Sequence, residues 1–169
     1  MNRFVFDPGK VDGDNVLLSK EESRHISRSL RLQPGGEIEV FDGHGTVFKA
    51  EILEIGRRVK VRLDHCVSTG IMRGKPIWVL QGLLKGKKMD TVVQKCTELG
   101  AARFTPLISS RCQVKSDKTQ NSRRWERWQR ITMSACKQCL RTQPLVVDQA
   151  VPFAELFDLC EPGPNPLRL

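Results

Sequence analysis

The sequence predicts an α/β protein in which a small β-rich part precedes an α/β layer with parallel strands. Two observations predict this class. Early in the chain, polar and apolar residues alternate one by one, as in half-buried strands. Later, continuous apolar runs are separated by segments whose apolar residues recur at helical spacing. The two patterns meet between Val67 and Lys75, a stretch with two glycines and no clear period. We therefore predict a first domain over residues 1–70 and a second over residues 75–169.

Short strands and one helix account for the first domain. Gly36–Phe41 and Thr46–Ile55 alternate with period two around the turn residues Asp42–Gly45, which predicts a β-hairpin. Ser19 is suited to cap a helix that carries acidic residues in its first turn and ends at about Leu30. Strands at this spacing are typical of a compact barrel. Further strands are predicted at Asn15–Leu18 and Arg58–Leu63.

Longer apolar segments make up the second domain. Pro76–Leu84 is a nearly continuous apolar run, as expected for a strand buried on both faces of a parallel sheet. Helical spacing then extends from Lys88 to Leu99, and Gly100 is placed to end that helix. A long helix follows, in which Trp125 and Trp128 share the spacing of the other apolar residues, which favours core packing over base stacking. The remaining elements are strands at Arg103–Ile108 and Leu145–Val147 and a short helix at Pro152–Leu159.

The positive charge of the chain is concentrated in one region. The formal net charge is +9, and residues 85–141 hold 14 Lys and Arg against four Asp and Glu. Such a concentration is the electrostatic footprint of a phosphate-bearing partner, and it predicts nucleic acid. A basic surface that serves only solubility is the alternative.

The six cysteines stand at irregular spacing in a chain without a secretory signal, which predicts reduced thiols and a cytoplasmic location. Cys136 and Cys139 form a C-x-x-C, but zinc needs two more soft ligands near by, so we predict no metal. No segment approaches the roughly 20 apolar residues of a membrane span, so no membrane contact is expected.

Polar residues near the ends of the second-domain elements are candidates for chemistry. Lys95 and Glu98 are three apart, and so neighbours on one helix face. Gln138 and Arg141 have the same spacing, and an amide with a guanidinium suits a base edge and a phosphate. Arg111 follows a predicted strand, where sheets deliver functional loops. The plainer interpretations are a surface ion pair, a solvated helix end and a solvated loop.

Cations also crowd the first predicted helix and its exit. Such a cluster suits an RNA groove that is read by backbone and shape, although an exposed basic helix face is equally compatible with the pattern. The candidates for RNA binding along the whole chain are Arg3, Arg24, His25, Arg28, Arg31, Lys85, Lys88, Lys95, Arg124 and Gln138.

Several short motifs stand in a fixed order between Met1 and about Pro144. They are Asn2-Arg3-Phe4, His25 with Ser29-Leu30-Arg31, the hairpin Gly36–Gly43, Gln94-Lys95 with Glu98-Leu99-Gly100, Arg111, Arg124-Trp125, and Gln138 with Arg141 and Pro144. This order resembles that of the SPOUT-class ribosomal RNA small subunit (16S rRNA, uracil-N3) methyltransferases.

The resemblance implies a PUA-like RNA-binding β-barrel followed by a SPOUT methyltransferase domain that dimerises. The implied reaction transfers a methyl group from S-adenosylmethionine to N3 of a uridine in 16S rRNA. Glu98, Arg111 and Arg141 are the implied catalytic residues: the arginines would favour the uridine anion, and Glu98 would orient the base or accept its proton. The implied partners are 16S rRNA or the small ribosomal subunit and a second copy of the chain.

The sequence departs from the family pattern in two ways. Lys137 stands where the family usually has an acid, and neither the Gly-Pro-Glu-Gly-Gly loop nor the Leu-Gly-x-Arg-Ile-Leu-Arg stretch of the cofactor knot occurs. We therefore expect a truncated SPOUT domain without its trefoil knot, with cofactor-binding residues unknown and apolar surface exposed on Pro76–Leu84. A catalytically silent RNA-binding protein and a dimerisation scaffold are the alternative functions.

Overall fold

The computed structural model describes residues 2–69, 75–110, 112 and 118–159. Its contacts divide the chain into two units, the first made of Met1–Gly74 with Met133–Pro144 and the second of Lys75–Thr132 with Leu145–Leu169. The helix α3 (Lys118–Cys139) therefore counts with the second unit up to residue 132 and with the first unit beyond it. The sequence pattern does not reveal this return of the chain to the first unit.

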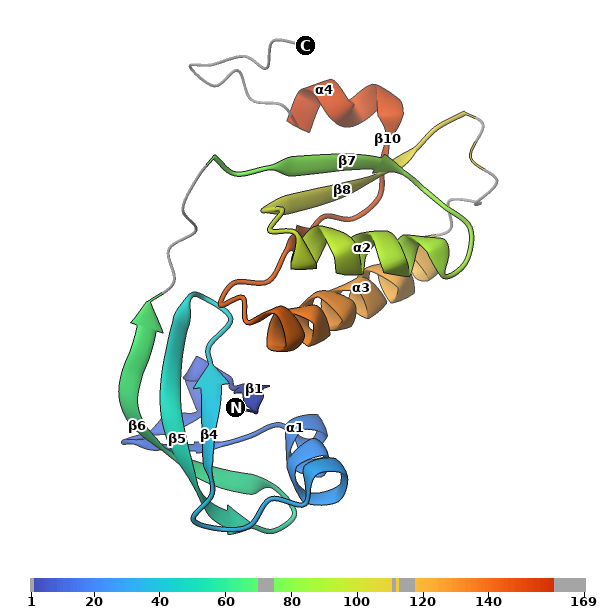
Figure 1. Ribbon diagram of the computed structural model, residues 1–169. Coiled ribbons are helices and arrows are strands. Elements are labelled where there is room, and N and C mark those ends of the chain that lie inside the picture. Colours follow the sequence, from blue (N-terminus) through green and yellow to red (C-terminus); the bar gives the residue numbers. More distant parts are fainter. Residues whose placement is uncertain (1, 70–74, 111, 113–117, 160–169) are drawn as a thin grey trace. The chain divides into compact units, whose positions relative to one another are not determined.

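The first unit is built on a six-stranded sheet with the order β1-β4-β5-β6-β3-β2 (Figure 1). All its strand pairs are antiparallel except β1 with β4. The strands of the predicted barrel form, but no closed barrel is detected, because among the described strands β1 and β2 stand at opposite ends of this order. Both end strands are short, and the two residues of β2 are exposed. The strands are β1 (Arg3–Val5), β2 (Val11–Asp12), β3 (Asn15–Leu17), β4 (Glu37–Phe41), β5 (Thr46–Ile55) and β6 (Val59–Thr69).

The predicted hairpin is confirmed as β4 and β5, with Phe41 opposite Val47. The turn is held by Asp42, whose Oδ1 accepts the backbone N–H groups of His44 at 2.7 Å and of Gly45 and Thr46 at 3.0 Å. Burial acts to raise the pKa of Asp42, but these hydrogen bonds outweigh it and hold the pKa below its ordinary value. The turn that the sequence predicts at Asp42–Gly45 therefore forms.

The first predicted helix forms as two short helices, α1 (Lys20–Arg24) and the π-helix η2 (His25–Leu30). Ser19 Oγ accepts the N–H of Glu22 at 3.1 Å, which confirms the predicted cap. Ser23 and Ser27 donate their hydroxyls to the carbonyls four residues earlier, at 2.7 and 2.8 Å. Such bonds compete with the regular helical ladder and accompany the change of helix type. A single 3-10 turn, η1 (Pro8–Lys10), precedes these helices.

The core of the first unit lies between its sheet and its helices, where Phe4, Leu18, Ile26, Ile38 and Ile52 are fully buried. Because side chains alternate along strands, one face of each strand supplies this core. A smaller cluster joins Phe41 and Val47 to Cys136, which comes from the end of α3. The last turns of α3 are thus packed as part of the first unit.

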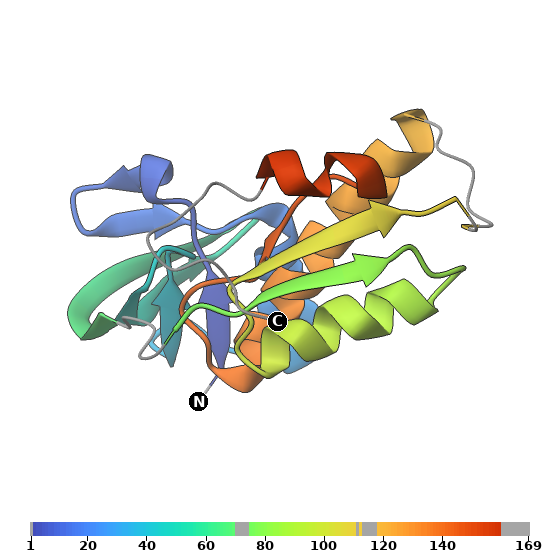
Figure 2. The ribbon, with the colours of Figure 1, turned by 90° about the horizontal axis from the view of Figure 1, so that it is seen from above.

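The second unit contains a parallel sheet with the order β10-β8-β7, with β9 pairing on β8. Figure 1 shows α2 and the first part of α3 on one face of this sheet and α4 on the other. Seen from above in Figure 2, β7 and β8 run side by side. The strands are β7 (Trp78–Gly82), β8 (Arg103–Ile108), β9 (Val146–Val147) and β10 (Val151–Pro152), and the helices are α2 (Lys88–Glu98), η3 (Phe153–Glu155) and α4 (Leu156–Leu159).

The helices of the second unit pack as their spacing predicts. Met89 and Val93 of α2 join Phe104 of β8 and Trp128 of α3 in one buried cluster. Trp125 packs against the same cluster and donates its indole N–H to the carbonyl of Val147 at 2.7 Å. Core packing of the two indoles is therefore confirmed.

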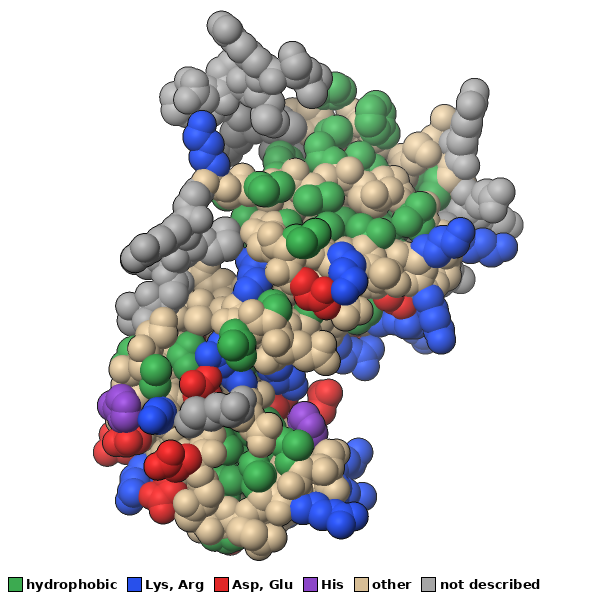
Figure 3. Space-filling view, in the orientation of Figure 1, with side chains coloured by type: hydrophobic (Ala, Val, Ile, Leu, Met, Phe, Trp, Pro, Cys, Tyr) green, Lys and Arg blue, Asp and Glu red, His purple; other side chains and the backbone are tan. Residues whose placement is uncertain are grey.

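The strand β7 is not buried on both faces, which corrects the prediction from its apolar run. Ile77, just before the strand, is 60% exposed, and Leu80 within it is 39% exposed. Figure 3 shows green hydrophobic side chains gathered on this part of the second unit. The reason is position, because β7 is the last strand of the described sheet order and is paired there only with β8. The apolar surface expected on this segment is confirmed.

Candidate nucleic-acid interface

The carboxyl end of α2 carries a small polar cluster around Glu98. Glu98 accepts hydrogen bonds from Lys95 Nζ at 2.6 Å and from Gln94 Nε2 at 2.8 Å. These two bonds, that of Lys95 first, hold the pKa of Glu98 below its ordinary value. The carboxylate is therefore ionised at neutral pH and is a weaker base than an ordinary glutamate. Its chemistry suits the orientation of a hydrogen-bond donor better than the uptake of a proton.

The other candidates of the second unit surround α2 and α3. Lys85 and Lys88 are exposed before and at the start of α2. Arg124 is half-buried on α3 and donates from Nη1 to Asn121 Oδ1 at 3.2 Å. Arg111 lies outside the described residues.

The end of α3 supplies two more candidates, and they belong to the first unit. Gln138 is exposed on the last turn of the helix, and Arg141 is half-buried just after it. Between them Leu140 has a positive φ of 60°, which ends the helix. Glu98 belongs to the second unit, so the candidates for catalysis are spread over both units.

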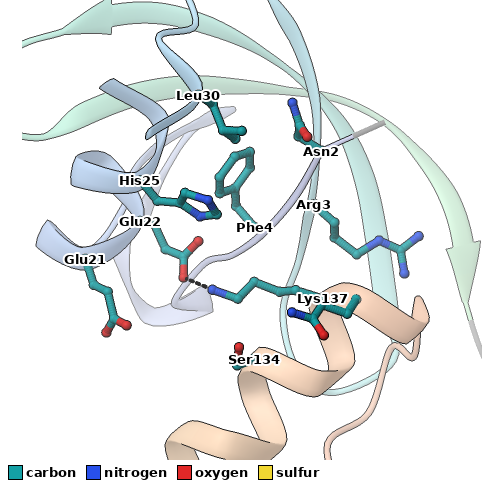
Figure 4. A pocket seen from close by; sticks show the side chains of 10 residues that line it. Asn2, Arg3, Phe4, Glu21, Glu22, His25, Leu30, Ser134 and Lys137 are labelled. Atoms are coloured by element: carbon teal, nitrogen blue, oxygen red, sulfur yellow. Dashed lines mark hydrogen bonds and ion pairs between the residues drawn. The ribbon is translucent and has the colours of Figure 1, made fainter. Parts of the chain in front are cut away.

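The first unit holds a pocket of about 480 Å³ between α1, η2, β1 and the end of α3 (Figure 4). Three of the predicted RNA-binding residues, Arg3, His25 and Gln138, line it. The structure thus brings together residues that stand far apart in the sequence. The full lining is Asn2, Arg3, Phe4, Glu21, Glu22, His25, Leu30, Ser134, Lys137 and Gln138.

A buried ion pair lies in the wall of this pocket. Glu22 is only 3% exposed, and its Oε1 accepts a hydrogen bond from Lys137 Nζ at 2.6 Å (Figure 4). Among the described residues, the second carboxylate oxygen, Oε2, has no hydrogen-bond partner. Lys137, which departs from the family pattern, is therefore the charge partner of Glu22.

Arg3 is a structural part of the pocket. Its Nε and Nη2 donate to Glu39 Oε2 at 3.0 and 2.7 Å, and its Nη1 donates to the carbonyl of Leu140 at 2.7 Å. The side chain is 10% exposed, so these bonds leave little of the guanidinium for a phosphate. His25 is exposed, and its ring meets Phe4 edge-on, with centroids 5.7 Å apart.

A second hollow, of about 340 Å³, is basic. The predicted residues Arg24 and Arg28 line it together with Lys20 and Arg57, which sequence reasoning missed. Figure 3 shows Lys and Arg side chains over α1 and η2. Four cations around a hollow suit the phosphates of a nucleic acid backbone. Arg31 is exposed where η2 ends, with a φ of 52°.

Sequence reasoning also missed Glu22, Lys137 and Ser134 as pocket residues. An acidic residue in the first turn of a helix is expected to be exposed, because it stabilises the helix dipole from the surface. Glu22 is buried only because its partner, 115 residues away in sequence, lies beside it. Local spacing carries no signal of such a pair.

The C-x-x-C of Cys136 and Cys139 lies at the end of α3, and the Cys136 thiol is buried. Burial, with a smaller contribution from Cys139, raises the pKa of Cys136 to about 11, so the thiol stays protonated. Within the described parts of the chain, no three His, Cys, Asp or Glu gather as a metal-ligand group. A helix able to cross a bilayer is likewise not found in those parts.

Comparisons with protein families concern both units of the chain. Residues 73–163 match the family model described as the RNA methyltransferase domain, and residues 18–64 match that described as the RNA methyltransferase PUA domain. The chain therefore belongs to the class of RNA methyltransferases with a PUA-like first domain and a parallel-sheet methyltransferase domain.

Individual relatives narrow the class to one family. The ribosomal RNA small subunit methyltransferase E of Aquifex aeolicus is 37% identical over 90% of this chain and 66% of its own length. That of Synechocystis sp. is 31% identical over 99% of this chain and 53% of its own length, so the chain spans about half of this relative. A crystal structure of the Neisseria gonorrhoeae enzyme bound to S-adenosyl methionine is 31% identical and superimposes with a TM-score of 0.87, covering 96% of this chain and 67% of that chain. The chain belongs to the ribosomal RNA small subunit methyltransferase E family.

Proposed function

We propose that the chain contributes RNA docking and base positioning to an S-adenosylmethionine-dependent methyltransferase that acts on N3 of a uridine in 16S rRNA. The observation that carries this proposal is the match of almost the whole chain to a small subunit methyltransferase E whose structure holds S-adenosyl methionine. The basic hollow of the first unit supports the RNA part independently, because its four cations suit a phosphate backbone.

The proposed roles follow from the chemistry of uracil N3, which must lose its proton to accept a methyl group. Cationic side chains such as Arg111 and Arg141 would favour the resulting anion. The ionised Glu98 would orient the base by accepting the hydrogen bond of N3–H until that proton leaves to solvent. S-adenosylmethionine supplies the methyl group when bound. In the part of the chain that the structure describes, we identify no residue set that fits this cofactor, so no step is assigned through it.

The proposed partners are 16S rRNA or the small ribosomal subunit and a second copy of the chain. The exposed apolar residues of the second unit support self-association, because such surface is commonly covered by a partner. We propose the cytoplasm as the location, since ribosomal RNA is the substrate and the five described cysteines are free thiols.

Calorimetric titration of the purified chain with S-adenosylmethionine tests the proposal, with a full-length family member as positive control. Binding in the micromolar range, followed by methyl incorporation into small subunits, would support the enzymatic part of the proposal. A folded sample that binds RNA but neither binds the cofactor nor transfers methyl would overturn the enzymatic part and leave RNA binding. A sample that binds neither would leave the scaffold as its function.

A further inference from the structure

We infer that the pocket of the first unit binds one unpaired nucleobase and reads its exocyclic amino group through Oε2 of Glu22. The inference rests on the proposed RNA-docking role of this unit and adds a base-specific site to it. The site is distinct from the basic hollow, with which the pocket shares no lining residue.

The unpartnered oxygen of Glu22 is the first argument. A carboxylate oxygen that is buried without a hydrogen bond is costly, so a ligand that supplies a donor gains the whole of that missing bond. The ion pair with Lys137 occupies the other oxygen and holds the carboxylate in place. The acceptor is therefore preorganised before a ligand arrives.

The chemistry of the bases decides which ligands fit an anionic acceptor. Adenine, cytosine and guanine each carry an amino group on their pairing edge, and this group donates hydrogen bonds. Uracil carries carbonyl oxygens there, which a carboxylate repels, and its single N–H donor lies between them. A single negatively charged acceptor consequently favours adenine, cytosine and guanine over uracil.

The rest of the pocket suits a planar, polar ring. Its volume of about 480 Å³ is within the roughly 300–1,000 Å³ of small-ligand sites. His25 is exposed and its ring packs against that of Phe4 in a T-shaped arrangement, so its imidazole offers a surface on which a base can stack. The amides of Asn2 and Gln138 add groups that both donate and accept.

The same two helices connect the pocket to cations. Glu22 and His25 line the pocket, whereas Arg24 and Arg28 on α1 and η2 line the basic hollow. A single strand can therefore place a base against the first pair while its phosphates contact the second. Unpaired RNA is the partner that offers both an accessible base for the pocket and phosphates for the cations.

Fluorescence anisotropy with short single-stranded oligoribonucleotides of one base each tests the inference on the full chain. Oligo(A) and oligo(C) should bind about tenfold more tightly than oligo(U), because one hydrogen bond to a charged acceptor is worth about that factor. In Glu22→Gln, Lys137 should take the amide oxygen and leave the amide NH₂ facing the pocket. This variant should lose the preference and bind oligo(U) best.

Two further variants make the test specific. Glu37→Gln changes an exposed acid of the first unit outside the pocket, so it removes the same charge and should keep the wild-type preference. Ser134→Phe fills the pocket from the exposed face of α3 without removing the ion pair, and it should abolish the preference even if Glu22→Gln fails to fold. Equal binding of all three bases by the wild-type chain would overturn the inference and leave RNA docking intact. Binding of none of them would overturn both.

Discussion

The side chain of Asp42 shows how one residue can determine a turn. Its carboxylate accepts three backbone N–H groups, and its pKa is lowered in the folded chain. The unfolded state therefore binds a proton more readily, so stability rises with pH around this group. The contribution is fully present above about pH 4, near the unfolded pKa of ~3.9, and is lost as pH falls through the lower folded pKa.

We predict that Asp42→Asn lowers the free energy of unfolding by about 1–2 kcal/mol at neutral pH, because a neutral amide oxygen accepts weaker hydrogen bonds than a carboxylate does. The loss should shrink as the pH falls from about 4 through the lower folded pKa, because wild-type Asp42 becomes protonated over that range, first in the unfolded and then in the folded chain. Urea denaturation at several pH values measures this. Asp12→Asn, at an exposed position on β2, is the control and should leave stability at neutral pH nearly unchanged.

Cys136 should be chemically inert in the folded chain. Its thiol is buried and has a pKa of about 11, whereas Cys66 is exposed. Because the thiolate is the reactive form, iodoacetamide should label Cys66 first and Cys136 only after denaturation. Peptide mass spectrometry over a time course measures both rates. Labelling of Cys136 at the rate of Cys66 under native conditions would contradict the burial described above.

Residue-scale features were predictable where the partners are local. The cap at Ser19, the turn at Asp42 and the ion pair between Lys95 and Glu98 each join residues within four positions, and all three form. The pairing of Glu22 with Lys137 joins residues 115 positions apart, and no local pattern encodes it. The main acceptor of the pocket was therefore missed, although His25 and Gln138 in its lining were not.

At the scale of elements, the end of α2 depends on one glycine. Gly100 has a φ of 91°, in the left-handed region that side chains disfavour. Gly100→Ala should therefore lower the free energy of unfolding by about 1–2 kcal/mol, although a Cβ there would meet no neighbour within 4 Å. Gly82→Ala is the matched control, since its Cβ also meets nothing and its φ is ordinary. Thermal denaturation compares the two; equal melting temperatures would show that strain at Gly100 is unimportant.

Elements whose apolar residues follow a clear period were predicted correctly. Properties that depend on neighbouring elements, such as the burial of β7 and the closure of the first sheet, were not. The β4–β5 hairpin, α2 and the indole face of α3 follow from period two or from helical spacing. The exposure of β7 depends on whether another strand lies beside it, which an apolar run cannot tell. Closure of the first sheet likewise depends on the two strands at the ends of its order, β1 and β2.

At the scale of the whole molecule, the net charge of +9 should make RNA binding strongly dependent on salt. We predict that the double variant Arg24→Gln/Arg28→Gln reduces the slope of log affinity against log salt by about 1.4, because each phosphate contact to a single strand contributes about 0.7. Anisotropy titrations at increasing potassium chloride measure the slope. Lys10→Gln/Arg62→Gln removes the same charge away from the hollow and should change the slope less.

The exposed apolar residues around β7 should make the chain self-associate. Sedimentation velocity at rising protein concentration should show an increasing average mass, and Ile77→Thr/Leu80→Thr should reduce that increase. Leu17→Thr/Val67→Thr removes exposed apolar surface from the first unit instead and should have little effect. A monomer at all concentrations would exclude association through β7.

The return of residues 133–144 to the first unit has a consequence for synthesis on the ribosome. The N-terminal part of a chain is synthesised first. Phe41 and Val47 can therefore pack against Cys136, and Glu22 can pair with Lys137, only after the end of α3 has been made. The sheet of the first unit can assemble early. The pocket of that unit is complete only after translation of the end of α3, which supplies Ser134, Lys137 and Gln138 to its lining. The nascent protein can therefore form the sheet of its first unit well before the proposed base pocket is complete.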